Sequence, residues 1–371
     1  MYVPLERACA SMLELKDVGK RVGDDDHISD VSLTFDRASV NVLLGPTLAG
    51  KTTLMRLMAG LDKPTSGDIR FNDKSVLGVS VRNRNVAMVY QQFINYPGLT
   101  VYENIASPMR LARLDEKTLD RKVRDTASLL KLEPYLDRKP LELSGGQQQR
   151  TAIARALVKE ADLVLLDEPL ANLDYKLREE LRVELPRLFA ETGAIFVYAT
   201  TEPQEALLLG GQTATLFEGR VTQFGGTLDV YHRPSDLATA QTFSDPPFNT
   251  GNIKVSNGQM IFEGRSLGYV GDTHRSIPDG EYIAGIRPHH LSLEPTDKHT
   301  VELPCVIGTC EITGSETFIH VDVTGDSWVA LTHGVHKLNP QDEISLYINP
   351  ESVYLFDQRG SITCVPQSTG H

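Results

Sequence analysis

Short apolar runs separated by helical patterns fill the first two thirds of the chain. Short, mainly apolar runs at residues 40–44, 163–166 and 195–198 are typical of strands buried on both faces of a sheet. After the first run, apolar residues at helical spacing predict a helix over residues 52–59, which Gly60 would end. Strands that alternate with helices predict a mostly parallel α/β sheet.

The pattern changes after residue 237. Stretches of alternating apolar and polar residues, such as 318–323 and 343–347, are separated by glycine and proline. This pattern is typical of a small β-barrel or β-sandwich. A length of 371 residues also favours more than one domain. We therefore expect an α/β domain over residues 12–237 and an all-β domain over residues 238–371.

The chain has no feature of a membrane-spanning or secreted protein. Residues 1–11 contain one arginine and no long apolar core, so they make a poor signal peptide. The first strand-like pattern begins at Met12, and we expect residues 1–11 to be a disordered or non-native extension. No apolar run approaches the ~18–20 residues that a membrane-spanning helix needs.

Composition argues against a disordered chain, a coiled coil and a basic nucleic-acid-binding protein. Apolar residues make up 40% of the chain and charged residues 23%, as in ordinary globular proteins. The formal net charge of -12 argues against nucleic-acid binding by an overall basic surface.

Cysteine and histidine indicate neither a disulfide framework nor a metal centre. The four cysteines are too few for a disulfide scaffold, and Cys305 and Cys310 lack a second pair at zinc-site spacing. Several histidines lie in the all-β region, and we expect them to be solvated: His289, His290, His320, His333 and His336.

Residues 45–52 carry the clearest chemical motif. They read Gly-Pro-Thr-Leu-Ala-Gly-Lys-Thr between a predicted strand and a predicted helix, and they fit G-x-x-x-x-G-K-[ST]. Backbone N–H groups of such a loop surround phosphate groups, and Lys51 would add a positive charge beside the β and γ oxygens. Thr52 would offer its hydroxyl to Mg²⁺. The expected nucleotide-binding residues are Gly45, Pro46, Thr47, Leu48, Ala49, Gly50, Lys51, Thr52 and Thr53.

Two carboxylates follow the apolar run at residues 163–166. A parallel strand would deliver Asp167 and Glu168 to the end of the sheet where ligands bind in open α/β folds. Asp167 would then contribute to the Mg²⁺ shell, and Glu168 would polarise the attacking water. Alone, such a pair is more often a helix cap or a solvated pair, but the phosphate loop upstream favours the catalytic interpretation.

Residues 143–150 read Leu-Ser-Gly-Gly-Gln-Gln-Gln-Arg at the start of a predicted helix. A serine before two glycines is compatible with a simple helix cap or with an anion site. The eight residues together resemble the signature motif of ATP-binding cassette (ABC) ATPases. Gln91 stands where that family has its Q-loop, and residues 170–174 resemble its D-loop.

The resemblance covers residues 12–237 and implies an α/β P-loop NTPase with a helical subdomain at about residues 92–155. It implies that Gln91 acts with Glu168 in catalysis and joins Thr52 and Asp167 at Mg²⁺. The ATP-binding residues that it adds to the phosphate loop are Ser144, Gly145, Gly146, Gln147 and Asp174.

The C-terminal region narrows the resemblance. Residues 284–288, 314–317 and 350–357 resemble segments of the small OB-like regulatory β-domain in maltose-type importer ATPases. The resemblance implies an ATPase subunit of a sugar or polyol importer, on the cytoplasmic face of the bacterial inner membrane. The partners that it implies are two membrane permease subunits and a second ATPase subunit that completes the ATP site. A solute-binding protein would be an indirect partner.

Two positions depart from the family pattern. Thr201 stands where the family has a switch histidine, and threonine cannot carry a proton at neutral pH. Val22 stands where the family has an aromatic residue that stacks on adenine. Both belong to the half-site of this chain's own phosphate loop, whereas the signature is intact, so we expect pairing with a second, different ATPase chain.

Three alternatives stay open at this point. A homodimer would have to tolerate Thr201 and rely on Glu168 and Gln91. A regulatory nucleotide-binding subunit would have little catalysis, although the retained Glu168 argues against its complete loss. A non-transport ABC protein usually has two cassettes or a long coiled-coil insertion, and the spacing between Lys51 and Ser144 leaves no room for one. Among sugars and polyols, the threonine at position 201 favours a glycerol-like solute.

Overall fold

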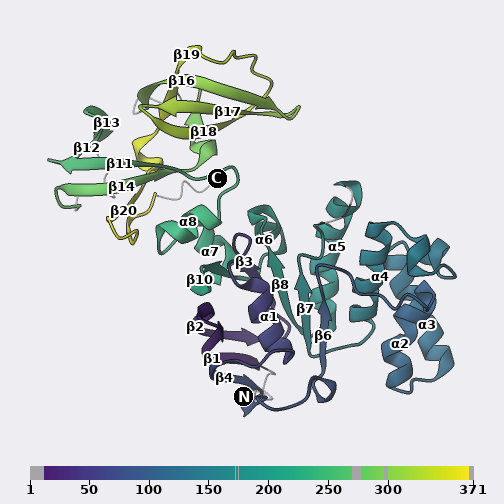
Figure 1. Ribbon diagram of the computed structural model, residues 1–371. Coiled ribbons are helices and arrows are strands. Elements are labelled where there is room, and N and C mark those ends of the chain that lie inside the picture. Colours follow the sequence, from purple (N-terminus) through teal and green to yellow (C-terminus); the bar gives the residue numbers. More distant parts are fainter. Residues whose placement is uncertain (1–11, 172, 174, 270–276, 296–299, 367–371) are drawn as a thin grey trace, which may run out of the picture. The chain divides into compact units, whose positions relative to one another are not determined.

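The computed structural model describes residues 12–171, 173, 175–269, 277–295 and 300–366 (Figure 1). Residues 1–11, the expected extension, lie outside this described part. The chain divides into two compact units, Met1–Thr227 and Leu228–His371, here called the N-terminal unit and the C-terminal unit.

The C-terminal unit begins at Leu228, whereas the sequence pattern predicted an all-β domain that begins at residue 238. The short helices α7 (Thr227–His232) and α8 (Leu237–Thr242) are held by Arg287, which is buried in the C-terminal unit. The guanidinium of Arg287 donates hydrogen bonds to Tyr231 O at 2.5 Å and to Phe243 O at 3.0 Å. The helical pattern of residues 227–242 does not reveal this distant partner.

The N-terminal unit contains two sheets. A four-stranded antiparallel sheet has the order β2-β1-β4-β5, and a six-stranded sheet has the order β10-β9-β3-β8-β7-β6. The first is formed by β1 (Met12–Val22), β2 (Asp25–Asp36), β4 (Ser66–Phe71) and β5 (Lys74–Ser75). The second is formed by β3 (Val40–Leu44), β6 (Val86–Val89), β7 (Leu163–Asp167), β8 (Ile195–Thr200), β9 (Gln212–Phe217) and β10 (Arg220–Gly226).

The three apolar runs become the strands at the centre of the second sheet. β3 pairs in parallel with β8 and β9, and β7 pairs in parallel with β6 and β8. Every residue of β7 and β8 is buried, which explains why residues 163–166 and 195–199 are apolar without a break rather than alternating. Only β10 runs antiparallel to its neighbour in this sheet.

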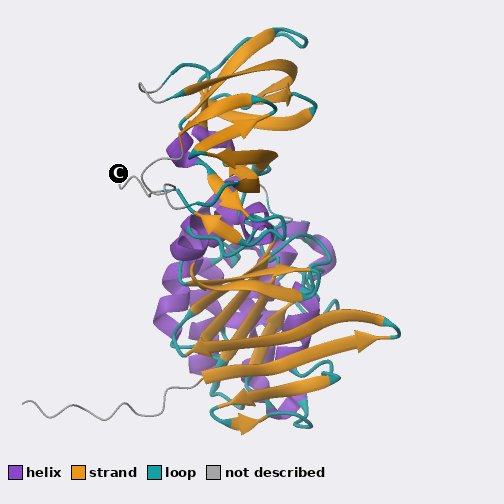
Figure 2. Cartoon of the chain, turned by 90° about the vertical axis from the view of Figure 1, so that its left-hand side faces the viewer, coloured by secondary structure: helices purple, strands orange, loops and turns teal. Residues whose placement is uncertain are grey.

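Helix α1 (Lys51–Ala59) shares one apolar core with the four-stranded sheet and with one face of the six-stranded sheet. The other face belongs to a second core. That core includes residues of α2 (Val101–Leu111), α3 (Glu116–Leu129), α4 (Gly145–Leu157) and α5 (Tyr175–Thr192). Helix α6 (Pro203–Leu209) follows β8. Figure 2 shows the N-terminal unit from the side of the four-stranded sheet, with helices behind the strands.

The C-terminal unit consists mainly of two antiparallel sheets, in the orders β13-β12-β11-β14-β20-β21 and β15-β19-β16-β17-β18. The first contains β11 (Asn249–Ser256), β12 (Gln259–Phe262), β13 (Arg265–Tyr269), β14 (Gly280–Ile286), β20 (Tyr354–Phe356) and β21 (Ile362–Cys364). The second contains β15 (Leu291–Ser292), β16 (Val301–Ile312), β17 (Glu316–Val323), β18 (Asp326–His333) and β19 (Glu343–Ile348).

Side chains of both sheets form one core around Trp328 of β18, which is 1% exposed. The Trp328 indole donates a hydrogen bond to Thr250 O of β11 at 3.0 Å, so its buried N–H is satisfied. The expected small all-β domain is confirmed.

Candidate nucleotide site

The phosphate loop connects the buried strand β3 to helix α1. Its last residue, Gly50, has a φ of 100°, a backbone conformation that favours glycine. At Gly45, an added Cβ would lie 2.5 Å from Leu216 O of β9, so the close approach of the two backbones requires glycine. These two glycines therefore fix the path of the loop and place Lys51 at the start of the helix.

Lys51 is buried and held by the loop that precedes it. Its Nζ donates hydrogen bonds to Gly45 O at 2.7 Å and to Pro46 O at 2.9 Å, and lies 3.8 Å from Glu168 Oε1. Burial lowers the pKa of Lys51, and the nearby carboxylates of Glu168 and Asp167 partly oppose this shift. A confined ammonium surrounded mainly by neutral carbonyls is well placed to neutralise a phosphate.

The end of β7 brings a carboxylate to the first turn of α1. The Thr52 hydroxyl donates a hydrogen bond to Asp167 Oδ2 at 2.8 Å, although the two residues are far apart in sequence. Burial raises the pKa of Asp167, while the bond from Thr52 and the charge of Lys51 oppose this shift.

The donor set fits Mg²⁺. This ion prefers oxygen ligands and binds through one or two carboxylates together with substrate phosphates and water. Thr52 and Asp167 supply such oxygens. Within the described residues, no group of three or more His, Cys, Asp or Glu side chains could hold a metal ion.

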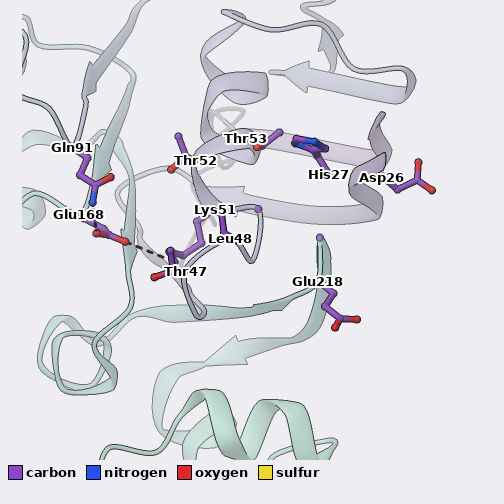
Figure 3. Close-up of a pocket in the computed structure, with 12 residues that line it drawn as sticks. Asp26, His27, Thr47, Leu48, Lys51, Thr52, Thr53, Gln91, Glu168 and Glu218 are labelled. Carbon is purple, nitrogen blue, oxygen red and sulfur yellow. Dashed lines mark hydrogen bonds and ion pairs between the residues drawn. The ribbon is translucent and has the colours of Figure 1, made fainter. Parts of the chain in front are cut away.

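Glu168 lies directly after β7 in a conformation that is uncommon for a residue with a side chain. Its φ is 45°, and its backbone N–H donates a hydrogen bond to Ala199 O of β8 at 3.0 Å. Its carboxylate accepts a hydrogen bond from Gln91 Nε2 at 2.8 Å, and Figure 3 shows this pair beside Lys51. Uncommon backbone conformations of this kind cluster at functional sites, where surrounding contacts hold them in place.

These residues share a cavity of about 540 Å³ in the N-terminal unit. Its lining residues come from the phosphate loop and α1, from Gln91 and Glu168, from the start of β2 and from the turn after β9 (Figure 3). The lining residues that the sequence did not predict are Asp26, His27, Glu218 and Gly219. No local motif marks them, because only the folded sheets bring these two segments to the phosphate loop.

Comparison with known proteins gives the family. Residues 28–171 match the family model described as ABC transporter, and residues 284–356 match the TOBE domain. The chain is 33% identical to the sn-glycerol-3-phosphate import ATP-binding protein UgpC of Vibrio cholerae, over 94% of both chains. It is also 33% identical to the trehalose/maltose import ATP-binding protein MalK of Thermococcus litoralis, over 93% of this chain and 97% of that protein. This chain belongs to the ABC transporter family.

Solved structures agree with this assignment. A dimeric structure of the ATP-binding cassette MJ0796, in a post-hydrolysis state with ADP and Pi bound, is 28% identical to this ABC ATPase. It covers 58% of this chain and 98% of that chain, with a TM-score of 0.54. The expected ABC ATPase fold followed by a small OB-like β-domain is confirmed. Among the described residues, no helix is long and apolar enough to cross a membrane.

The signature segment of this ABC ATPase lies at the N-terminus of α4. Ser144 Oγ accepts a hydrogen bond from Gln147 N at 3.3 Å, and the Gln147 side chain accepts one from Ser144 N at 3.0 Å. This reciprocal capping fixes the start of the helix and leaves Gly145 exposed and Gly146 half-buried. None of these residues lines the cavity of about 540 Å³.

Val22 and Thr201 are also not among the described residues that line the cavity. Val22, at the end of β1, is 51% exposed, and Thr201, directly after β8, is exposed. Asp174 lies outside the described residues. The structure therefore brings together Lys51, Thr52, Gln91 and Glu168, with Asp167 bonded to Thr52.

Proposed function

We propose that this chain is the ATP-hydrolysing subunit of a membrane importer for a sugar, a polyol or a glycerol phosphate. The similar proteins are described as import ATP-binding proteins for sn-glycerol-3-phosphate, for trehalose and maltose, and for xylose and arabinose. The observation that carries the proposal is the convergence of Lys51, the Thr52–Asp167 pair and the Gln91–Glu168 pair.

Each of these groups has a separate task in ATP hydrolysis. Lys51 would neutralise the β and γ phosphate oxygens. Thr52 and Asp167 would hold Mg²⁺, which would supply further positive charge for the phosphates. Glu168 accepts the proton of the attacking water, and the amide of Gln91 keeps the Glu168 carboxylate in position. The remaining ATP-binding residues are those of the phosphate loop, with Ser144 to Gln147 serving the site of a partner chain.

The assembly that this function requires contains further subunits. Two membrane permeases would bind the ATPase chains at the cytoplasmic face of the membrane, and a solute-binding protein would act through those permeases. The solute is chosen by these partners rather than by the ATP site. No nucleic acid takes part.

Steady-state ATPase measurement of the reconstituted complex tests the function. Lys51→Ala should weaken ATP binding, whereas Glu168→Gln should leave ATP binding intact and slow hydrolysis at this chain's site. Glu218→Gln is the matched control, because Glu218 lines the same cavity and has no role in this chemistry. If the complex neither binds nor hydrolyses ATP, the proposed function is wrong.

The second part of the proposal is that the ATPase partner is a different chain. Thr201 is exposed, is not among the described residues that line the cavity, and has a hydroxyl that does not take up a proton at neutral pH, as a histidine can. The signature segment, by contrast, is fully formed and capped at the start of α4. This asymmetry supports a heterodimer in which this chain's own site is slow and its signature completes a faster site on the partner.

ATPase activity of the purified chain alone separates the heterodimer from a homodimer. The heterodimer predicts slow turnover without the partner and little further loss when Glu168→Gln is placed in the complete complex. A homodimer predicts that the same change silences both sites. Rapid turnover by the chain alone would overturn the heterodimer. A regulatory role would be supported if the corresponding glutamate of the partner carried all activity.

A further inference from the structure

We infer that His27, rather than a residue at position 22, provides the ring against which the nucleobase of ATP packs in this chain. The inference rests on the proposed ATP site and concerns the end of the same cavity away from Glu168. His27 and Thr53 line this cavity, whereas Val22 does not.

A β-bulge gives His27 its position. On the pairing of β1 with β2, Lys20 is opposite Ile28 and Arg21 is opposite Asp26. His27 is therefore the extra residue, with no partner on β1. A bulge bends its strand and re-aims the side chain of the extra residue. Val22 stays in register opposite Asp25, beside the turn of the hairpin.

Two glycines hold the backbone of His27 against the phosphate loop. A Cβ added to Gly219 would lie 2.6 Å from His27 O, and one added to Gly50 would lie 3.0 Å from the same oxygen. Gly219 in turn donates its N–H to Ala49 O at 3.1 Å and accepts a hydrogen bond from Ser29 N at 2.9 Å. The distance between the bulge and Lys51 is thus set by backbone packing rather than by a flexible side chain.

The direction of the nucleotide follows from the chemistry at the other end of the cavity. Lys51 and Glu168 mark the place of the terminal phosphates, and Figure 3 shows His27 on the side of the view opposite to Gln91 and Glu168. A nucleotide whose phosphates lie at Lys51 therefore extends its nucleoside towards His27.

The wall beside His27 suits an uncharged base. Asp26 accepts two hydrogen bonds from the Arg21 guanidinium, at 2.8 and 3.2 Å, so the charges of these two neighbours cancel. The exposed imidazole offers a flat π face. Stacking of a base on an aromatic side chain depends on the face of the base and not on its hydrogen-bonding edge.

A ring at position 27 bears on the difference between this chain's own ATP site and the site that its signature completes. A stacking ring at position 27 compensates for the missing aromatic side chain at position 22. ATP binding at this chain's own site is then retained, and the slow step proposed for that site rests on Thr201 alone.

Binding of two ligands to the full-length chain tests the inference by calorimetry with Mg²⁺ present. ATP contains the base, and inorganic tripolyphosphate contains only the phosphates. His27→Ala should weaken ATP binding by about fivefold or more, and leave tripolyphosphate binding unchanged. His27→Phe should keep ATP binding, because it restores a ring. Val22→Ala is the matched control and should bind both ligands as the wild type does.

The outcomes separate this inference from the proposed function. Equal ATP affinity of His27→Ala and wild type, or a larger loss in Val22→Ala than in His27→Ala, would overturn the role of His27 while leaving the ATP site standing. Equal weakening of both ligands in His27→Ala would also overturn it, because the effect would not involve the base. A wild-type chain that binds neither ligand would instead refute the ATP site itself.

Discussion

Replacement of Lys51 by methionine should have opposite effects on ATP binding and on the stability of the ligand-free chain. The Lys51 side chain is 5% exposed, and the hydrogen-bond partners of its ammonium are the neutral carbonyls of Gly45 and Pro46. Burial lowers its pKa, which means that the folded chain disfavours the charged form. Methionine has a similar length and needs no hydration, so Lys51→Met removes this cost.

The loss in ATP binding follows from the missing charge. A hydrogen bond to a charged group contributes about 1.5–3 kcal/mol, which corresponds to an affinity loss of roughly 10- to 150-fold. Titration of the variant with a fluorescent ATP analogue measures this loss. Wild-type affinity in Lys51→Met would refute the placement of the phosphates at Lys51.

The stability effect has a definite dependence on pH. Because the pKa of Lys51 is lower in the folded chain, the unfolded chain binds more protons in the interval between the folded and unfolded values. The cost of burying the charge is fully present below that interval and disappears above it. The free energy of unfolding should therefore rise more with alkaline pH for the wild type than for Lys51→Met. Urea unfolding across the interval measures the difference, and identical pH profiles would contradict the buried charge.

Three further changes test the rest of the site. Asp167→Asn should stabilise the ligand-free chain at neutral pH, because burial raises the pKa of Asp167 and its ionisation therefore costs stability. The same change should weaken Mg²⁺-dependent ATP binding, and thermal melting with and without Mg²⁺-ATP measures both effects. Ser144→Arg should abolish transport by the assembled importer, because it removes the helix cap and adds bulk at the partner's ATP; unchanged uptake would contradict a composite site. Thr201→His should raise ATP hydrolysis at this chain's site, and an unchanged rate in the complex would count against Thr201 as the cause of its slow turnover.

The sequence by itself determined the parts of the site that are continuous in the chain. A phosphate loop needs glycines and a lysine at fixed spacing because consecutive backbone N–H groups bind the phosphates, so residues 45–52 are recognisable locally. The same holds for Asp167 and Glu168 at the end of a buried strand, and for the helix start at Ser144. Apolar periodicity likewise predicted the parallel sheet and the all-β C-terminal unit, because burial imposes that pattern on each strand separately.

Only the tertiary structure decided which distant residues meet. The hydrogen bond from Gln91 to Glu168 depends on the placement of the segment after β6 beside β7, and the contacts of Arg287 decide where the C-terminal unit begins. His27 had no motif to reveal it. Its place in the cavity results from a bulge in strand register and from two glycines that approach its carbonyl from other segments. Such close approaches leave no local pattern, because their cause lies in residues far away along the chain.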